Sequence, residues 1–177
     1  VHRIKKTKNE AKLLNLFAYT GMATVACVQA GAAVTHVDLL KPCLDWARAN
    51  LDINSIPNGV RLIPEEAITF VEREVKRGNR YDIIILDPPG FSRISKQQSW
   101  SIEDILPKLV RDLSKIINPG GEIFFTCHGA EHGSTIVRNI FEETLGTNIT
   151  VEERQLILGE PKATPLLPAG YLVRISC

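Results

Sequence analysis

The chain has 177 residues, a length typical of one domain, and at this size folding buries roughly 70% of the surface exposed by the unfolded chain. Its 44% hydrophobic and 23% charged residues are typical of a soluble globular protein, and a net charge of +1 favours no particular class of partner. No apolar run reaches the roughly 20 residues that span a bilayer, so a membrane protein is excluded at this stage.

Strand and helix patterns alternate along the chain with short connections, which predicts a parallel sheet covered by helices on both faces. A polar loop is predicted at residues 90–99 and a turn at 118–121. The predicted strands are residues 13–17, 34–37, 61–63, 83–86, 122–127, 149–157 and 171–175, and the predicted helices are 22–30, 42–51, 64–76, 101–117 and 134–145.

The strand at residues 83–86 is the most diagnostic element, because four aliphatic residues in a row, three of them β-branched, indicate a strand buried on both faces. The last two strands have no helix between them and are predicted to form an antiparallel hairpin. The expected fold class is therefore α/β, a Rossmann-like domain whose seven-stranded, mostly parallel sheet includes one reversed strand.

Polar or glycine-bearing loops follow the strands at 13–17, 34–37 and 83–86, at the edge where open α/β sheets bind ligands. Gly21 ends the first loop, and a single glycine in place of a GxGxxG run suits a ligand without phosphates. Asp38 ends the second strand, where a carboxylate accepts hydrogen bonds from both hydroxyls of a ribose or caps the next helix. Glu66 and Ala67 begin the third helix, where they meet an adenine edge or match the helix dipole.

A stiff acidic turn follows the fourth strand. Asp87 is followed by Pro88 and Pro89, whose fixed carbonyls can accept hydrogen bonds from an exocyclic amine. Phe91 can stack on a flipped base, or it belongs to a rigid loop as a core side chain. This turn is predicted to form the part of the site where the chemical reaction takes place.

Cys127 ends the next strand, beside the acidic turn in such a sheet. A thiolate there can attack C6 of a pyrimidine and make C5 nucleophilic enough to take a methyl group. His128, its neighbour, is expected to lower the pKa of the thiol. The alternative is a small buried side chain, and Cys27, Cys43 and Trp46 are predicted to be core residues of helices.

The four cysteines lie far apart and form no CxxC or paired-histidine pattern, so no metal site is predicted. No secretory signal opens the chain. We therefore expect a cytoplasmic protein with reduced thiols and no membrane association.

Together these motifs resemble class I S-adenosylmethionine-dependent methyltransferases, most closely the bacterial enzymes that methylate large-subunit ribosomal RNA. Residues 14–21 resemble the family's cofactor loop, 37–50 its ribose-binding motif with the following helix, and 82–91 its catalytic-loop motif. The terminal hairpin, with Pro161 and Gly170, also matches. The resemblance implies S-adenosylmethionine as cofactor and RNA as substrate, with Phe17, Tyr19, Thr20, Gly21, Asp38, Leu39, Glu66, Ala67 and Asp87 holding the cofactor or ordering its loop.

Two kinds of reaction occur in enzymes of this type. Members that make 5-methylcytosine carry a cysteine in a Ser-Cys-Ser context, at the place where this chain has Thr126, Cys127 and His128. Other members keep the Asp-Pro-Pro-x-Phe loop without the cysteine and methylate a guanine ring nitrogen, giving 7-methylguanine, or an unknown acceptor. The cytosine-type enzymes also carry an amino-terminal RNA-binding domain, so residues 1–177 are expected to form the catalytic domain alone.

The expected function is methyl transfer to a base in RNA, and to cytosine C5 if Cys127 is the nucleophile. Three alternatives stay open. The chain can act on a small molecule or protein, or it can be a non-catalytic RNA-binding remnant of the fold. A nicotinamide-dependent dehydrogenase is the third, and the lone Gly21 argues against it.

Overall fold

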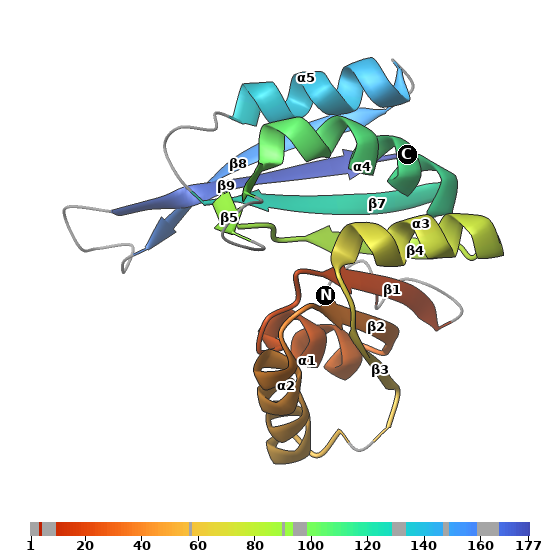
Figure 1. Ribbon diagram of the computed structural model, residues 1–177, viewed down its shortest axis with the longest axis vertical. Helices are drawn as coiled ribbons and strands as arrows, with labels where there is room; N and C mark the ends of the chain where they lie inside the picture. Colours follow the sequence, from red (N-terminus) through yellow and green to blue (C-terminus); the bar gives the residue numbers. More distant parts are fainter. Residues whose placement is uncertain are drawn as a thin grey trace.

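A seven-stranded sheet with the strand order β3-β2-β1-β4-β7-β9-β8 forms the centre of the molecule (Figure 1). The computed structural model describes residues 4, 10–56, 58–89, 91–93, 99–128, 134–146, 149–158 and 167–177. The strands of this sheet are β1 (Ala11–Leu16), β2 (Ala32–Asp38), β3 (Val60–Pro64), β4 (Tyr81–Leu86), β7 (Ile117–Cys127), β8 (Thr150–Leu158) and β9 (Leu167–Ser176). The helices are α1 (Met22–Gln29), α2 (Lys41–Ile53), α3 (Ala67–Arg77), α4 (Ile102–Ile116) and α5 (Ser134–Leu145).

The sheet is parallel except at one strand. β1 pairs in parallel with β2 and β4, β2 with β3, and β4 with β7. β9 is antiparallel to both β7 and β8, so it is the single reversed strand. The predicted fold class is confirmed, and the carboxyl ends of β1, β2, β4 and β7 all lie at one edge of the sheet.

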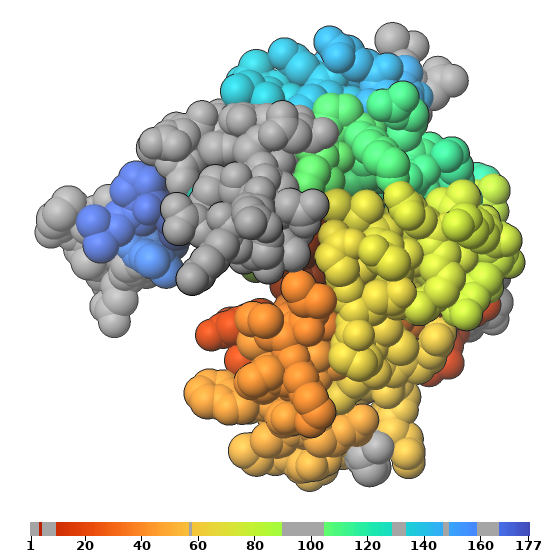
Figure 2. All heavy atoms as spheres, in the orientation of Figure 1, coloured from red at the N-terminus to blue at the C-terminus, as the bar shows by residue number. Residues whose placement is uncertain are grey.

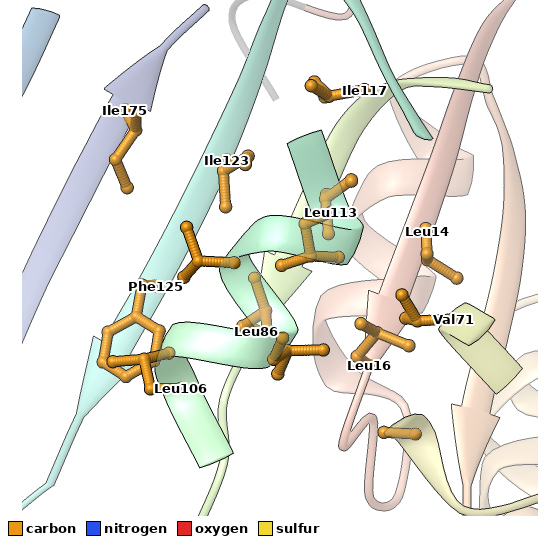
Figure 3. Packing of buried hydrophobic residues seen from close by; sticks show 14 of the residues in the cluster. Leu14, Leu16, Val71, Leu86, Leu106, Leu113, Ile117, Ile123, Phe125 and Ile175 are labelled. Carbon is orange, nitrogen blue, oxygen red and sulfur yellow. The ribbon is translucent and has the colours of Figure 1, made fainter. Parts of the chain in front are cut away.

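Helices cover both faces of the sheet because side chains alternate between the faces along each strand. On one face Leu14 and Leu86 pack with α3, α4 and α5, including Val71 and Leu113 (Figure 3). On the other face Leu13 packs with residues of β2 and with α1. The two central strands β1 and β4 are therefore buried on both sides, which fixes the positions of the loops that follow them.

Several element boundaries differ from the prediction, each for a local reason. Pro64 ends β3 and does not begin α3, because Glu66 is the N-cap and its carboxylate accepts the Thr69 amide at 3.0 Å. Residues 118–121, predicted as a turn, lie within β7, where the pairing with β4 jumps from Ile117 to Glu122. Part of the predicted loop at 90–99 forms strand β5 (Phe91–Arg93), which pairs with β6 (Ser99–Ser101). Gly90 and Pro161 lie outside the described residues.

Trp46 was predicted to be a core residue and this prediction is wrong, since 66% of its surface is exposed. The buried side of α2 carries Leu44, Ala47 and Leu51, at the spacing of one helix face. Trp46 lies two residues from Leu44, and such positions do not share a helix face. Cys27 and Cys43 are buried, as predicted.

Candidate cofactor and acceptor site

The loops after β1, β2, β4 and β7 meet at the carboxyl-end edge of the sheet. In Figure 2 the red and orange atoms of the amino-terminal half and the blue atoms of β8 and β9 lie on different sides of this edge. The site residues predicted from the sequence lie in these loops, at the start of α3, at the ends of β2 and β7 (Asp38 and Cys127) and in β5 (Phe91). Topology therefore brings together residues that lie up to 110 positions apart in the chain, such as Phe17 and Cys127.

The loop after β1 has a strained backbone. Phe17 has a φ of 56° and Tyr19 a φ of 49°, in the left-handed region that side chains with a Cβ rarely adopt. The Ala18 amide donates to the carbonyl of Val37, and the Gly21 amide donates back to that of Ala18. Strain of this kind persists where the surrounding contacts impose it and is concentrated at functional sites. The sequence carries no sign of it, because neither aromatic residue favours this conformation.

Gly21 allows α1 to begin against α2. Its φ of 87° is left-handed, and a Cβ at this position would lie 3.1 Å from the Cβ of Ala47. The side-chain amide of Asn50 donates to the carbonyl of Thr20 at 2.8 Å. The loop after β1 is thus fixed to α2 from two directions.

Asp38 connects the loops after β1 and β2. One of its oxygens accepts the Tyr19 amide at 2.8 Å and the other accepts the Leu40 amide at 2.9 Å. The N-cap of α2 is Leu40, whose own side chain makes no capping hydrogen bond, and Asp38 lies two residues before it, so Asp38 is not the cap. Each carboxylate oxygen keeps further acceptor capacity. Leu39, next to Asp38, is 52% exposed and offers an apolar contact at the same place.

A buried polar chain supports this loop from below. The side-chain amide of Asn15 donates to the Thr24 hydroxyl at 2.9 Å, and that hydroxyl lies 2.9 Å from Nδ1 of His36. The Thr24 hydroxyl thus joins the Asn15 amide of β1 to the imidazole of His36 in β2. Burial lowers the pKa of His36 to about 4, although the charge of Asp38 and the backbone of Tyr19 favour the protonated ring. The sequence shows these residues as polar interruptions of two apolar strands and of helix α1, and their role was missed.

His36 is expected to make stability depend on pH. Between pH 6.5 and about 4 the unfolded chain binds a proton at this position that the folded chain does not. The free energy of unfolding should therefore have its full value above pH 6.5. It should fall by about 3 kcal/mol as the pH drops from 6.5 to about 4. Urea unfolding from pH 7 to pH 4 measures it, and His36→Gln should lose this component. Equal pH dependence in both proteins would contradict the assignment.

Glu66 and Ala67 lie where the sequence places them, at the start of α3. One Glu66 oxygen accepts both the Thr69 amide at 3.0 Å and the Thr69 hydroxyl at 2.6 Å. Glu65 is paired with Arg73, and its amide donates to the carbonyl of Asp38 at 3.1 Å. The capping role of Glu66 is therefore shown, and its contact with an adenine edge stays a prediction.

Asp87 is surrounded by donors from β7. Its Oδ1 accepts the Thr126 hydroxyl and lies 2.9 Å from Nε2 of His128. Nδ1 of His128 lies 2.9 Å from the carbonyl oxygen of Ala169 in β9. Pro88 behind it is buried and Pro89 is exposed. The predicted catalytic turn is thus fixed to β7 and, through a histidine, to the terminal hairpin.

The surroundings of Cys127 differ from those predicted. Only 6% of this residue is exposed, it belongs to the main hydrophobic cluster, and burial raises the pKa of its thiol. The predicted lowering of this pKa by His128 is wrong, because the imidazole bonds to Asp87 and Ala169. The side chain of Phe91 lies outside the described part of the structure.

The sheet order and the acids after β2 and β4 define a class I methyltransferase domain. The sequence profile of the S-adenosylmethionine-dependent methyltransferases matches residues 2–152, and the chain belongs to this family. The resemblance noted in the sequence is thereby confirmed.

Curated relatives and solved structures agree with this assignment. A ribosomal RNA large subunit methyltransferase K/L from Pseudoalteromonas atlantica is 34% identical over 125 residues, covering 70% of this chain and 17% of the relative. The protein of the same name from Syntrophotalea carbinolica is 40% identical over 116 residues, covering 64% of this chain and 16% of the relative. The chain thus spans about a sixth of the length of these relatives.

Among solved structures, an S-adenosylmethionine-dependent methyltransferase from Agrobacterium tumefaciens has a TM-score of 0.91 at 29% identity, covering 99% of this chain and 58% of that one. A methyltransferase solved with S-adenosylhomocysteine has a TM-score of 0.77 at 23% identity, covering 99% and 47%. The second likeness shows the fold. None of the helices in the described residues is long and apolar enough to cross a membrane.

The residues at the sheet edge fit S-adenosylmethionine, the cofactor of this family. The Asp38 carboxylate keeps acceptor capacity for ribose hydroxyls. The first loop has a single glycine where phosphate-binding loops have several, which agrees with a cofactor that carries no phosphate. The exposed side chains of Tyr19 and Leu39 flank the carboxylate and provide apolar surface.

Proposed function

We propose that this chain transfers a methyl group to a base in RNA, with large-subunit ribosomal RNA as the substrate, and that residues 1–177 act as the catalytic domain. The placement of the two acids carries the proposal. Asp38 and Asp87 follow β2 and β4, which flank β1, so two strand spacings, on the order of 10 Å, separate the strands that carry them. The names of the curated relatives support the substrate class. Such a substrate places the reaction in the cytoplasm.

The residues on the two sides of β1 would have different roles, one set binding the cofactor and the other placing the acceptor base. Asp38, with the loop of Phe17 to Gly21, would hold the nucleoside part of S-adenosylmethionine, which supplies an electrophilic methyl group when bound. The carbonyls of the Pro88–Pro89 turn would accept hydrogen bonds from the acceptor base. Holding acceptor and donor in line is the main catalytic contribution that this arrangement offers, because orientation alone can supply a large part of the rate.

Transfer to a nitrogen of the base is the better supported route. Methylation at cytosine C5 needs a thiolate, and burial raises the pKa of the Cys127 thiol in the free protein. A guanine ring nitrogen carries its own lone pair and needs no protein nucleophile. The site offers such an acceptor a fixed carboxylate at Asp87.

Cys127→Ala separates the two routes. We expect the variant to keep methyl transfer within about threefold of the unchanged protein, because a buried thiol outside the reaction contributes only packing. Tritium transfer from labelled S-adenosylmethionine measures it, with calorimetric titration of S-adenosylhomocysteine as the control for folding and cofactor binding. Loss of transfer with unchanged binding would establish the cytosine C5 route.

The function itself is tested by offering the chain several acceptors. In-vitro-transcribed large-subunit ribosomal RNA should accept tritium, and small-subunit RNA, a mixture of bacterial proteins and a small-molecule extract should not. Digestion of the labelled RNA to nucleosides then identifies the modified base. Labelling of protein or small molecules alone would favour the alternative substrates. Absence of S-adenosylhomocysteine binding by the folded protein would favour the non-catalytic remnant.

A further inference from the structure

The terminal hairpin contains a β-bulge next to the site. β8 and β9 pair Leu156 with Gly170 but Ile157 with Pro168, so Ala169 is an extra residue on β9. A bulged residue is displaced from the regular ladder, and bulges often re-aim groups beside active sites. The carbonyl of Ala169 lies 2.9 Å from Nδ1 of His128. The bulge thus gives His128 a partner on the neighbouring strand.

Gly170 brings this strand close enough for the contact. It has a φ of 123°, and a Cβ at this position would lie 2.1 Å from the carbonyl oxygen of Cys127 and 3.3 Å from Cα of His128. No side chain can occupy that space without moving β9 or the end of β7. A residue other than glycine would therefore push Ala169 away from the imidazole.

The hydrogen bonds of His128 determine where its protons are. Nδ1 faces a carbonyl oxygen, which only accepts, so Nδ1 carries a proton. Nε2 faces Oδ1 of Asp87 at 2.9 Å, so a second proton lies between these two atoms. Oδ1 also accepts the Thr126 hydroxyl. His128 therefore links the carbonyl of Ala169 to the carboxylate of Asp87.

This arrangement leaves one side of the Asp87 carboxylate available. Both donors bind Oδ1, and Oδ2 makes no hydrogen bond with the described residues. One donor, Thr126, belongs to β7, the other, His128, directly follows β7, and His128 is in turn held by β9. The orientation of Oδ2 is thus set by contacts from β7 and β9. The residues proposed to bind the nucleoside part of the cofactor follow β1 and β2.

The hairpin that holds His128 extends past the carboxyl end of β7, over the side of the sheet where the site lies (Figure 1). Near its end Ile157, Leu158 and Leu167 have exposed side chains. A substrate lying at the Asp87 turn would meet the hairpin next. Movement of the hairpin would then shift the Asp87 carboxylate through the imidazole of His128.

We propose that His128 is a positioning residue that couples the β8–β9 hairpin to the carboxylate of Asp87 and so sets the orientation of the acceptor base. The proposal rests on the proposed function for its effect on transfer, and on the hydrogen bonds alone for the coupling. His128 acts through Asp87 and does not itself react.

Two isosteric variants separate the two bonds of the imidazole. In His128→Gln the side-chain amide replaces Nε2 and can reach Asp87, and in His128→Asn it replaces Nδ1 and can reach Ala169. A coupling residue needs both bonds, so each variant should lower kcat by about 10- to 100-fold. Because the cofactor residues belong to other strands, the affinity for S-adenosylhomocysteine should stay within twofold. Gln155→Ala, an exposed change on the same hairpin, is the matched control and should leave kcat unchanged.

A second measurement needs no substrate. In nitrogen-15-labelled free protein both ring N–H protons of His128 should give resonances protected from exchange, assigned by their disappearance in His128→Gln. Gly170→Ala should broaden or remove the Nδ1 resonance. Unprotected ring protons in the unchanged protein would overturn the coupling.

The combined results distinguish this proposal from the proposed function. Protected ring protons with an unchanged kcat in both His128 variants would overturn the positioning role. If the protein binds S-adenosylhomocysteine but labels no RNA, the proposed function fails, and the ring resonances still decide the coupling. If Gly170→Ala does not fold, the two His128 variants decide alone.

Discussion

Asp38→Ala is expected to weaken S-adenosylhomocysteine binding by about 100-fold without unfolding the protein. The carboxylate accepts the amides of Tyr19 and Leu40, and it is the group proposed to accept the ribose hydroxyls. Hydrogen bonds to a charged group contribute about 1.5–3 kcal/mol each, so loss of one or two accounts for this factor. Calorimetric titration measures the affinity, and the Tm from thermal unfolding checks the fold.

The loop after β1 makes this effect larger than that of a lost contact alone. Tyr19 has a left-handed backbone, and the hydrogen bond from its amide to Asp38 is one of the contacts that hold it there. Without the acceptor the strained loop is expected to relax and to lose its bound shape. Asp38→Asn keeps one acceptor oxygen and should show an intermediate affinity.

Asp45→Ala provides the matched control for Asp38. Asp45 lies one turn into α2, where it pairs with Lys41 at 3.3 Å on an exposed surface. Exposed pairs of this kind contribute little, so neither affinity nor stability should change measurably. Equal losses in the two alanine variants, or an Asp38→Ala variant within threefold of the unchanged protein, would place the cofactor elsewhere.

The sequence predicts the strands of this site better than the contacts between them. Four aliphatic residues before Asp87 indicate a buried strand, and Asp38 follows a second one, so both acids are placed correctly at the sheet edge. Strand periodicity contains no information about which loops touch. The contact between His128 and Ala169 joins residues 41 positions apart, and it depends on a β-bulge that no local sequence pattern predicts.

Sequence predictions were also wrong where one local sequence pattern fits two structural explanations. A tryptophan among leucines on α2 resembles a core residue, but helix geometry places Trp46 away from Leu44. A histidine after Cys127 resembles an activating neighbour, but adjacent residues at a strand end face different ways. In both cases the side-chain direction, which the residue types do not specify, decides the role.

The site as a whole depends on two kinds of support. The cofactor side is held by backbone amides and a strained loop after β1, and the acceptor side is held by side chains of β7 and the carbonyl of β9. Changes on one side are therefore expected to leave the other nearly intact. Affinity and turnover should separate cleanly between variants of Asp38 and variants of Asp87.

Asp87→Ala is expected to lower kcat for methyl transfer by about 100- to 1,000-fold, with a change of less than fivefold in S-adenosylhomocysteine affinity. The substitution removes the acceptor of both Thr126 and His128, so the turn of Pro88 and Pro89 loses its link to β7. Tritium transfer at saturating cofactor measures kcat, and calorimetry measures the affinity.

Asp82→Ala is the matched control, because Asp82 lies on the same strand at the opposite edge of the sheet. It accepts the Lys12 amide at 2.9 Å and the Asn118 side chain at 2.8 Å, so its loss is expected to lower stability and leave kcat unchanged. Asp87→Asn keeps one acceptor oxygen where the aspartate has two, and should lie between alanine and the unchanged protein. Turnover retained in Asp87→Ala would mean that the proline turn alone places the acceptor base.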